Sequence, residues 1–526
     1  MAESIQNVSS NLDVTKRKDV DLLHGKAVGL IGVLFLTLTG SAPITAMLLN
    51  VPIVVGNGNG LGSPAAFLVA TVILLVFSVG YAAMSAKVTA VGGFYSFISH
   101  GLGRELGMAM GFSAVVAYAV FEPSLAGGFA YFMNLKLSQL FGINVPWPVL
   151  ALGMVVLISL LTYFDIKISS AVLGVALVGE VIILILFDAG VFVHNGAGAT
   201  VQVAALNPVL AFQGFAAHDK LAAGAAGIGL FFAFWSWVGF EMAPNYAEES
   251  HDPKRIVPLS LYISVLALGV LYTLTCWAAQ SGYGTVDNAI NQAQNNSATF
   301  FFATASRLVA PWTASLMSYL ILTGSFACGM AFHNTAARYL YSLGREKLLP
   351  AAFGRTHKTY KTPYISSFVQ TAISFVIIAL FAIFAGWNNP NTQAYGELYG
   401  LMALLGTIII LAAQALVSVA IVVYFRREHP EDHHWWKTMI APVLAFVAQI
   451  YVIYLCISNL AFVGGGFGFA NLIPWIDLGV AVLGILFALY LKKNDPIKFD
   501  QIGRFIYQDI PDGPLAGAEH AQESRS

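Results

Sequence analysis

Four acidic residues lie inside long apolar stretches of this sequence, where an ionisable side chain is costly to bury. They are Glu122 in AYAVFEPSLAGGF, Glu180 in VALVGEVIILIL, Glu241 in WSWVGFEMAPN, and Glu397. A carboxyl group in such a place pairs with a polar neighbour or takes part in binding and proton transfer. For Glu122 the alternatives are a hydrogen-bonded structural carboxyl, a counter-charge for a substrate amine, and a proton carrier. The apolar neighbours of Glu180 favour its protonated form, which suits proton coupling.

Two of the apolar stretches contain helix-breaking residues near their middles. One is TLTGSAPITAMLLNVP, with Gly40, Ser41 and Pro43, and the other is AFWSWVGFEMAPNYAEES, with Gly239 and Pro244. A broken helix in hydrocarbon leaves backbone groups without partners unless it lines a cavity or binds a ligand. A single break would favour a packing kink. Two breaks at matching positions, five spans apart, favour a substrate site between two repeats.

Aromatic and acidic residues surround the second break. Trp235 precedes Gly239 by four residues, so it stands about one turn away on the same helix face and could stack on a cationic or apolar ligand. Phe240 and Glu241 follow the break directly. Glu241 is expected either to bind the broken backbone or to contact the substrate.

The composition identifies lipid as the main surroundings of these residues. Hydrophobic residues make up 57% of the 526-residue chain and charged residues 10%, whereas soluble proteins carry about a quarter charged residues. The formal net charge of -1 gives no basic field that would recruit nucleic acid. The three cysteines are far apart and match neither a disulfide framework nor a metal site, and no cofactor is expected. The sequence predicts an all-α integral membrane protein.

A membrane-spanning helix needs about 20 apolar residues, and about twelve segments meet this requirement. They are residues 27–55, 65–86, 107–135, 147–165, 169–193, 226–249, 257–280, 300–342, 366–386, 396–424, 439–462 and 470–491. The first 26 residues have no apolar core that would make them a signal peptide.

The positions of Lys and Arg predict the orientation. With the N-terminus inside, only Lys136, Lys220 and Arg307 of the 26 basic residues fall on the outer side. We therefore expect a plasma (inner) membrane protein with both termini in the cytoplasm. The expected parts are a cytoplasmic segment (1–26), a first repeat (27–193), a second repeat (226–424), two further spans (439–491) and a cytoplasmic tail (492–526).

Three motifs give the chain a family resemblance. VGGFYSFISHGLGRELGMAMGF, WSWVGFEMAPNYAEESHDPKRIVPLS and FACGMAFHNTAARYLYSLGREKLLPAAF occur in this order along the chain. In these motifs the sequence resembles the amino acid, polyamine and organocation (APC) superfamily of secondary transporters. The resemblance implies a LeuT-like fold, with a five-plus-five inverted repeat, discontinuous helices 1 and 6, two additional C-terminal helices, and alternating access.

The resemblance also implies roles for particular residues. Gly40, Ser41 and Ala42 match the unwound stretch whose backbone amides receive a substrate carboxylate. Gly239 and Phe240 match the break that receives the amino group. Trp235 matches a gating tryptophan of the arginine/agmatine antiporter, and Glu180 stands where several proton-coupled relatives have a lysine.

Two further positions bear on the substrate and the coupling ion. Pro43 offers no N–H, which together with Glu122 tilts the expectation mildly toward a substrate with an extra amine or without a carboxylate. Thr323 and Ser325 lie near the hydroxyl ligands of sodium-coupled relatives. Sodium therefore stays an option beside protons, although two hydroxyl groups without a carboxylate make a weak cation site.

These features together predict a permease for an amino acid or a related amine or polyamine, driven by proton symport. An amine or amino acid exchanger would use the same fold and site, and a membrane sensor would bind the ligand without moving it. An enzyme is disfavoured: His333 and Asn334 have no nucleophile or second ligand at a motif spacing, and a lone histidine in a helix is more often a packing residue. No P-loop is present in the sequence, which argues against ATP-driven pumping.

Overall fold

The fold is known from a computed structural model that describes residues 29–88, 92–164, 166–219, 221–360, 362–460 and 468–503. These residues are largely helical, and β-type pairing among them is limited to isolated bridges. The expected segment 1–26 and the part of the tail beyond residue 503 lie outside the described residues.

The helices follow one another along the whole chain. In order, the α-helices are α2 (Leu30–Ser41), α3 (Pro43–Ile53), α4 (Ser63–Ser85), α5 (Gly93–Leu102), α6 (Arg104–Phe141), α7 (Trp147–Phe164), α8 (Ile166–Val193), α9 (Ala226–Trp235), α10 (Pro253–Ser281), α11 (Val286–Asn295), α12 (Phe300–Leu308), α13 (Pro311–Arg345), α14 (Tyr364–Phe384), α15 (Gly400–Arg427), α16 (Ala441–Ser458), α17 (Ile473–Asn494) and α18 (Pro496–Gln501). The 3₁₀ and π segments that continue the spans are η2 (Val54–Gly58), η3 (Gly60–Gly62), η6 (Phe240–Glu249), η9 (Pro390–Tyr399), η11 (Trp435–Ile440) and η13 (Gly468–Leu472).

The expected all-α membrane fold is confirmed. Among the described residues, 11 helices are long and apolar enough to cross a membrane. They correspond to the expected spans except for the fifth, 169–193. That span is the 28-residue helix α8, and the side chains of its first eight residues lie outside the description. In a continuous helix the backbone N–H and C=O groups bond to one another, so they need no partner from the hydrocarbon, which has none to offer.

One local expectation was wrong, and two short helices had not been predicted. The single span expected at 300–342 is two helices, α12 and α13, because Ala310 precedes a proline and is extended at φ -170° and ψ 152°. Two short helices, α5 and α11, lie between spans and were not predicted. Each has only 10 residues, which is too short to stand out as an apolar segment.

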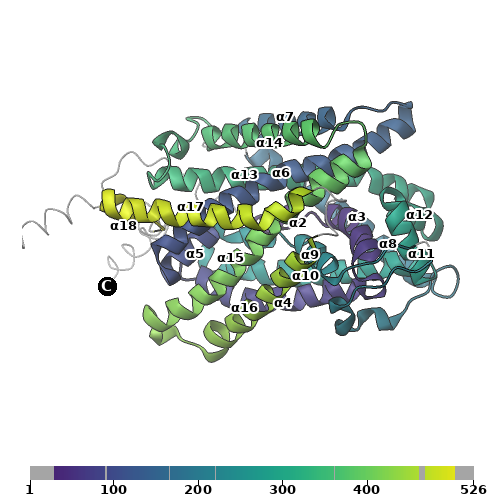
Figure 1. Ribbon diagram of the computed structural model, residues 1–526, viewed down its shortest axis with the longest axis horizontal. Helices are drawn as coiled ribbons and strands as arrows, with labels where there is room; N and C mark the ends of the chain where they lie inside the picture. Colours follow the sequence, from purple (N-terminus) through teal and green to yellow (C-terminus); the bar gives the residue numbers. More distant parts are fainter. Residues whose placement is uncertain are drawn as a thin grey trace, which may run out of the picture.

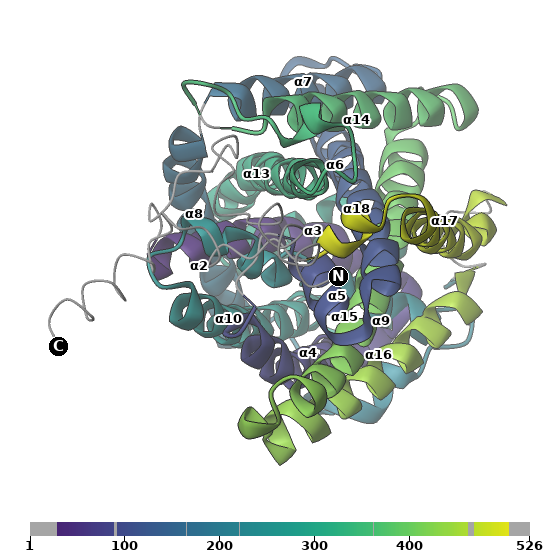
Figure 2. The ribbon, with the colours of Figure 1, turned by 90° about the vertical axis from the view of Figure 1, so that its left-hand side faces the viewer.

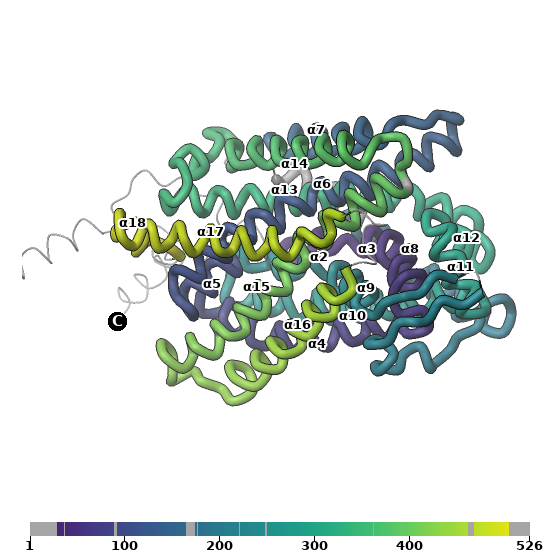
Figure 3. The backbone as a smooth tube through the Cα atoms, viewed as in Figure 1, coloured from purple at the N-terminus to yellow at the C-terminus, as the bar shows by residue number. Residues whose placement is uncertain are grey.

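The helices form a bundle in which the interrupted spans lie inside. Helices α7 and α14 run side by side along one face, with α6 and α13 beneath them (Figure 1, Figure 2). Helix α4 packs along α10 on the other side of the bundle. The tube in Figure 3 shows α5 and α18 at one end of the bundle, here called the α18 end, and α11 and α12 at the opposite end, the α11 end. The short helices α2, α3 and α9 lie between these layers (Figure 2).

Helix α17 can be used to test the packing, because it carries two glycines in different surroundings. A Cβ atom on Gly484 would lie 2.6 Å from the Cα atom of Ala109 in α6, whereas one on Gly479 would meet nothing within 4 Å. We expect Gly484→Val to destabilise the protein by about 1–3 kcal/mol through overpacking. Thermal unfolding of the purified protein in detergent measures the effect. Gly479→Val is the matched control, and equal unfolding midpoints for the two variants would contradict this packing.

Candidate substrate site

The first expected span is interrupted at Ala42. This residue takes the left-handed conformation, with φ 36° and ψ 80°, between the end of α2 and the start of α3. Pro43 begins α3, and because proline disfavours a helical residue before it, the chain leaves the helix at Ala42. The carbonyl groups freed by the break have partners: Tyr272 Oη donates to Ser41 O at 3.0 Å and Cys328 Sγ to Gly40 O at 2.9 Å.

The second break separates α9 from η6. Its pivot is Gly239, whose φ of 129° is in the region open to glycine. A Cβ atom on Gly239 would lie 2.7 Å from Ser41 N, so only a residue without a side chain fits here. Pro244, which the sequence placed at the break, lies inside η6 instead. The two breaks are therefore packed backbone against backbone at Gly239 and Ser41.

A small cavity of about 10 Å³ lies beside these breaks, close to the space that a single water molecule needs. Most of its lining is apolar side chain and backbone. The lining residues are Gly40, Ser41, Ala42, Thr45, Ala46, Asn50, Leu125, Trp235, Val238, Cys328, Phe332 and Tyr399. Of the expected site residues, only Gly40, Ser41, Ala42 and Trp235 are among them. None of the described residues that line the cavity is acidic.

Trp235 belongs to a hydrogen-bonded chain that closes one side of the cavity. Its Nε1 donates to Tyr399 Oη at 2.8 Å, and Tyr399 Oη donates in turn to Asn50 Oδ1. Asn50 Nδ2 donates to Ser236 Oγ at 2.8 Å. The Trp235 ring also stacks on Phe332, with 5.9 Å between ring centroids. These bonds connect α3, the end of α9 and the last residue of η9, on the side of the cavity toward the α11 end.

Glu122 does not reach the cavity. Its side chain is completely buried, and its Oε2 atom contacts His333 Nδ1 at 3.0 Å, Gln370 Nε2 at 2.9 Å and Ser374 Oγ at 2.8 Å. His333 Nε2 contacts Ser367 Oγ at 2.7 Å. The carboxyl group thus joins α6, α13 and α14 in one polar cluster, and His333 is not a lone histidine but its partner. This geometry gives Glu122 a structural set of neighbours rather than a place beside a substrate.

Glu180, a residue of α8, contacts the start of α3 and does not line the cavity. Its side chain is 2% exposed, and Oε2 accepts a hydrogen bond from Ile44 N at 3.3 Å. A Cβ atom on Gly324 would lie 2.8 Å from Glu180 Oε1 and 2.7 Å from Thr45 Oγ1. The absence of a side chain at Gly324 therefore leaves room for this carboxyl group next to Thr45, which lines the cavity. Thr45 Oγ1 is buried without a hydrogen-bond partner among the described residues.

The backbone amides at the first break are less free than the family resemblance implied. Ala42 N donates to Leu38 O at 2.9 Å, Pro43 has no N–H, and Ile44 N donates to Glu180. The first donor that faces the cavity without a partner is therefore the Thr45 hydroxyl group, not the amide of Ala42.

Two further predicted residues do not form a site together. The Thr323 side chain is exposed and donates to Leu320 O at 3.1 Å, whereas Ser325 is fully buried. Ser325 Oγ has no partner among the described residues. The two hydroxyl groups lie on different faces of α13, and the structure does not bring them together as cation ligands.

Glu241 and Phe240 support the second break. Glu241 Oε2 accepts a hydrogen bond from Gly239 N at 2.9 Å, and its Oε1 accepts one from Tyr118 Oη at 2.9 Å. Phe240 is buried with its ring edge-on to Phe77, at 6.3 Å between centroids. Neither side chain lines the cavity. The contacts of Glu241 fit the first of the two roles expected from the sequence, which is to bind the broken backbone.

Sequence reasoning missed Asn50, Tyr399 and Cys328. Asn50 is a polar residue inside an apolar segment, and this signal could have singled it out. Tyr399 and Cys328 give no such signal, because tyrosine and cysteine are ordinary residues of membrane helices.

Comparison with known proteins identifies the family. A family model described as amino acid permease matches residues 28–489. The chain belongs to this family. The branched-chain amino acid permease BcaP of Bacillus subtilis is 22% identical over 501 residues, which cover 91% of this chain and 93% of that protein. The low-affinity putrescine importer PlaP of Escherichia coli is 23% identical, over 60% of this chain and 66% of that protein.

A third relative extends the range of substrates. The methylthioribose transporter of Bacillus subtilis is 22% identical, over 84% of this chain and 88% of that protein. The permease is thus a membrane transport protein of the APC superfamily and not an enzyme. Its relatives carry amino acids, putrescine and methylthioribose, so the family alone leaves the substrate open.

The chain of hydrogen bonds at Tyr399 generates a prediction about closure of the cavity. Tyr399→Phe removes the acceptor of Trp235 and the donor to Asn50, and each buried group left unpaired costs about 1–3 kcal/mol. We expect the closed side to open more often and the Cys328 thiol to react about tenfold faster with a maleimide. The measurement uses Cys276→Ala/Cys456→Ala protein, in which Cys328 is the remaining thiol.

Tyr451→Phe is the control for this prediction, because it makes the same chemical change on a side chain that is 46% exposed on α16. Equal reaction rates in the two variants would show that the Trp235, Tyr399 and Asn50 bonds do not hold this side closed.

Proposed function

We propose that this permease carries a small zwitterionic amino acid with an apolar side chain across the plasma membrane, together with a proton, by alternating access. The observation that carries the proposal is the cavity at the two breaks, whose lining is apolar except for backbone, hydroxyl, thiol, amide and indole groups. Such a lining suits a ligand with no net charge.

The two ends of a zwitterion find complementary groups beside the breaks. A carboxylate fits near the Thr45 hydroxyl group at the start of α3, where the helix dipole favours negative charge. An ammonium group fits at Gly40 O, which accepts a hydrogen bond from the weak S–H donor of Cys328. Leu125, Val238 and Phe332 remain for an apolar side chain. The similarity to a branched-chain amino acid permease over most of the chain supports this choice.

A diamine substrate is the second candidate, supported by the similarity to a putrescine importer. It needs a negative partner for each ammonium group, because a charge buried without one is strongly unfavourable. The cavity lining offers no carboxylate, and Glu122 is engaged with His333, Gln370 and Ser374. From Pro43 and Glu122, the sequence mildly favoured a substrate with an extra amine or without a carboxylate. The contacts of Glu122 no longer support that expectation.

Glu180 is the proposed proton carrier. Its carboxyl group is buried next to the first break, and its hydrogen bond to Ile44 N connects its charge state to the start of α3. No basic side chain bonds to it among the described residues, so a proton is the simplest means of neutralising it. An exchanger would use the same site without net proton movement, which makes coupling the property to test.

The proposed orientation places the α18 end in the cytoplasm. Arg104, Arg345, Lys347 and Lys492 lie at the helix ends there, and loops rich in Lys and Arg stay inside. Residues 27–193 and 226–424 are the proposed inverted repeats, since each begins with a broken span.

A binding screen separates the two substrate classes. A ligand that binds only the folded protein raises its melting temperature by mass action. We expect leucine, isoleucine or valine to stabilise the purified permease and putrescine to leave it unchanged at the same concentration. Stabilisation by putrescine alone would overturn the proposed substrate class.

The coupling role of Glu180 is tested by Glu180→Gln in proteoliposomes. Glutamine keeps the size of the side chain and an oxygen that accepts from Ile44 N, but its amide does not take up or release a proton near neutral pH. We expect accumulation driven by a pH gradient to be lost, while exchange of labelled for unlabelled substrate continues. Glu397→Gln is the control, because the Glu397 side chain does not line the cavity. Unchanged accumulation in Glu180→Gln would remove Glu180 from coupling, and accumulation driven by a sodium gradient would point to sodium instead.

A further inference from the structure

The last described residues of the chain fold back onto the α18 end. We call α18 together with Ile502 and Gly503 the C-terminal strap. Phe499 and Ile502 of the strap are only 7% and 1% exposed, although they lie at the end of the bundle. Asp500 Oδ1 pairs with Arg104 Nη1 at 2.5 Å, at the first residue of α6. The Arg104 guanidinium also lies over the Phe499 ring, 5.3 Å from its centroid.

The tip of the strap is inserted between α5 and the end of α13. Gly503 N donates to Tyr95 Oη at 2.8 Å, and Tyr95 Oη donates to the buried carboxylate of Glu346. Burial and the neighbouring Glu346 raise the pKa of Tyr95, so its phenol group stays protonated and keeps this bond. Gly503 has φ 69°, and a Cβ atom there would overlap the Ser99 side chain. The tip therefore fits only as a glycine.

Helix α5 connects the strap to the substrate site. A Cβ atom on Gly93, the first residue of α5, would lie 3.0 Å from Asn245 Oδ1 in η6. Phe97 of α5 packs edge-on against Tyr81, at 5.2 Å between centroids. Tyr81 Oη donates to the backbone carbonyl of Glu241 at 3.1 Å. One side of α5 thus holds the strap, and the other side holds the half of span six that starts at the second break.

From these contacts we propose that the C-terminal strap is a latch that keeps the α18 end of the permease closed. While Gly503 is bound, α5 is fixed between the strap and η6. Release of the strap frees α5, lets η6 move away from α2, and opens the cavity toward the α18 end. This inference rests on the proposed alternating access, because it names what regulates opening on one side of that same site.

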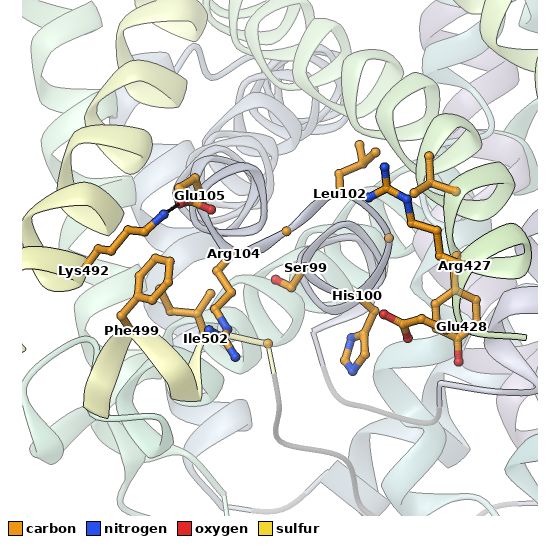
Figure 4. Close-up of a pocket in the computed structure, with 15 residues that line it drawn as sticks. Ser99, His100, Leu102, Arg104, Glu105, Arg427, Glu428, Lys492, Phe499 and Ile502 are labelled. Atoms are coloured by element: carbon orange, nitrogen blue, oxygen red, sulfur yellow. Dashed lines mark hydrogen bonds and ion pairs between the residues drawn. The ribbon is translucent and has the colours of Figure 1, made fainter. Parts of the chain in front are cut away.

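The ion pair between the strap and α6, Asp500 with Arg104, is accessible to water, because the Asp500 side chain is 58% exposed. An open cavity beside the strap is lined by Arg104, Glu105, Arg427, Glu428 and Lys492 (Figure 4). Beside Phe499, Lys492 Nζ of α17 pairs with Glu105 Oε1 of α6 at 2.8 Å, a pair that includes no strap residue (Figure 4). Ion pairs that face water are weakened by salt, so the latch is built to open more often as ionic strength rises.

Two truncations test the latch. A chain that ends at Asp495 lacks the strap, whereas a chain that ends at Gly503 keeps it and is the matched control. Both carry Cys276→Ala and Cys456→Ala, so that Cys328 in the cavity is the reporter thiol. A charged, membrane-impermeant maleimide is added to inside-out vesicles, where the α18 end faces the reagent. We expect Cys328 to react about tenfold faster in the shorter chain, the effect of losing one or two hydrogen bonds on an equilibrium.

Point variants keep the test valid if the shorter chain fails to fold. Gly503→Ala should accelerate the reaction in the same direction, whereas Gly468→Ala, where a Cβ atom meets nothing within 4 Å, should not. Asp500→Arg should also accelerate it, and Arg104→Asp/Asp500→Arg should restore the slow rate. Equal rates in the two truncated chains, or in Gly503→Ala and Gly468→Ala, would overturn the latch. Thiol labelling needs no substrate, so its result stands apart from a failure of the proposed substrate class or of proton coupling.

Discussion

The structure depends on how two interrupted backbones are satisfied in hydrocarbon. Each break leaves donors and acceptors that lipid cannot bind. The protein meets this demand by placing the two breaks against each other, where Gly239 allows the backbones to touch at Ser41. Ser41 Oγ donates to Trp237 O at 3.3 Å across the contact, and Glu241 accepts from Gly239 N. What stays unsatisfied, notably the Thr45 hydroxyl group, faces the cavity and is available to a ligand.

The number of partners separates the buried carboxyl groups by role. Glu122 contacts three polar side chains through one oxygen, and Glu241 accepts from a backbone amide and a phenol group. A carboxyl group held by several donors is a fixed part of the scaffold, because moving it would break several hydrogen bonds at once. Among the described residues, Glu180 has one hydrogen-bond donor, Ile44 N. Fewer bonds must be broken for Glu180 to change its charge state, which makes it the better candidate for coupling.

The sequence predicted the large features because they depend on composition and local chain chemistry. Hydropathy located the spans, and Pro43 and Gly239 located both breaks, since proline and glycine act on their own backbone. It could not predict the partners of Glu122, because His333 and Gln370 are separated from it by 211 and 248 residues along the chain. The same holds for Asn50 and Tyr399, and for the split of the span at 300–342, where the decisive signal was a single proline. The position of a residue along its helix gives the depth of its side chain in the membrane. Which neighbouring helix that side chain faces depends on how the helices pack.

The cavity is closed by different chemistry at its two ends. Toward the α11 end, the bonds among Trp235, Tyr399 and Asn50 are uncharged and buried, and they lie in the cavity wall itself. A substrate can contact these groups directly, so closure on that side can respond to binding. Toward the α18 end, the strap is held partly by the Asp500–Arg104 ion pair, which water reaches, and we propose that it acts on the cavity through α5 and η6. Closure there can respond to the solution at that end without any contact with the substrate. In a transporter with both closures, substrate binding would control opening toward the α11 end. The solution at the α18 end would control opening on that side.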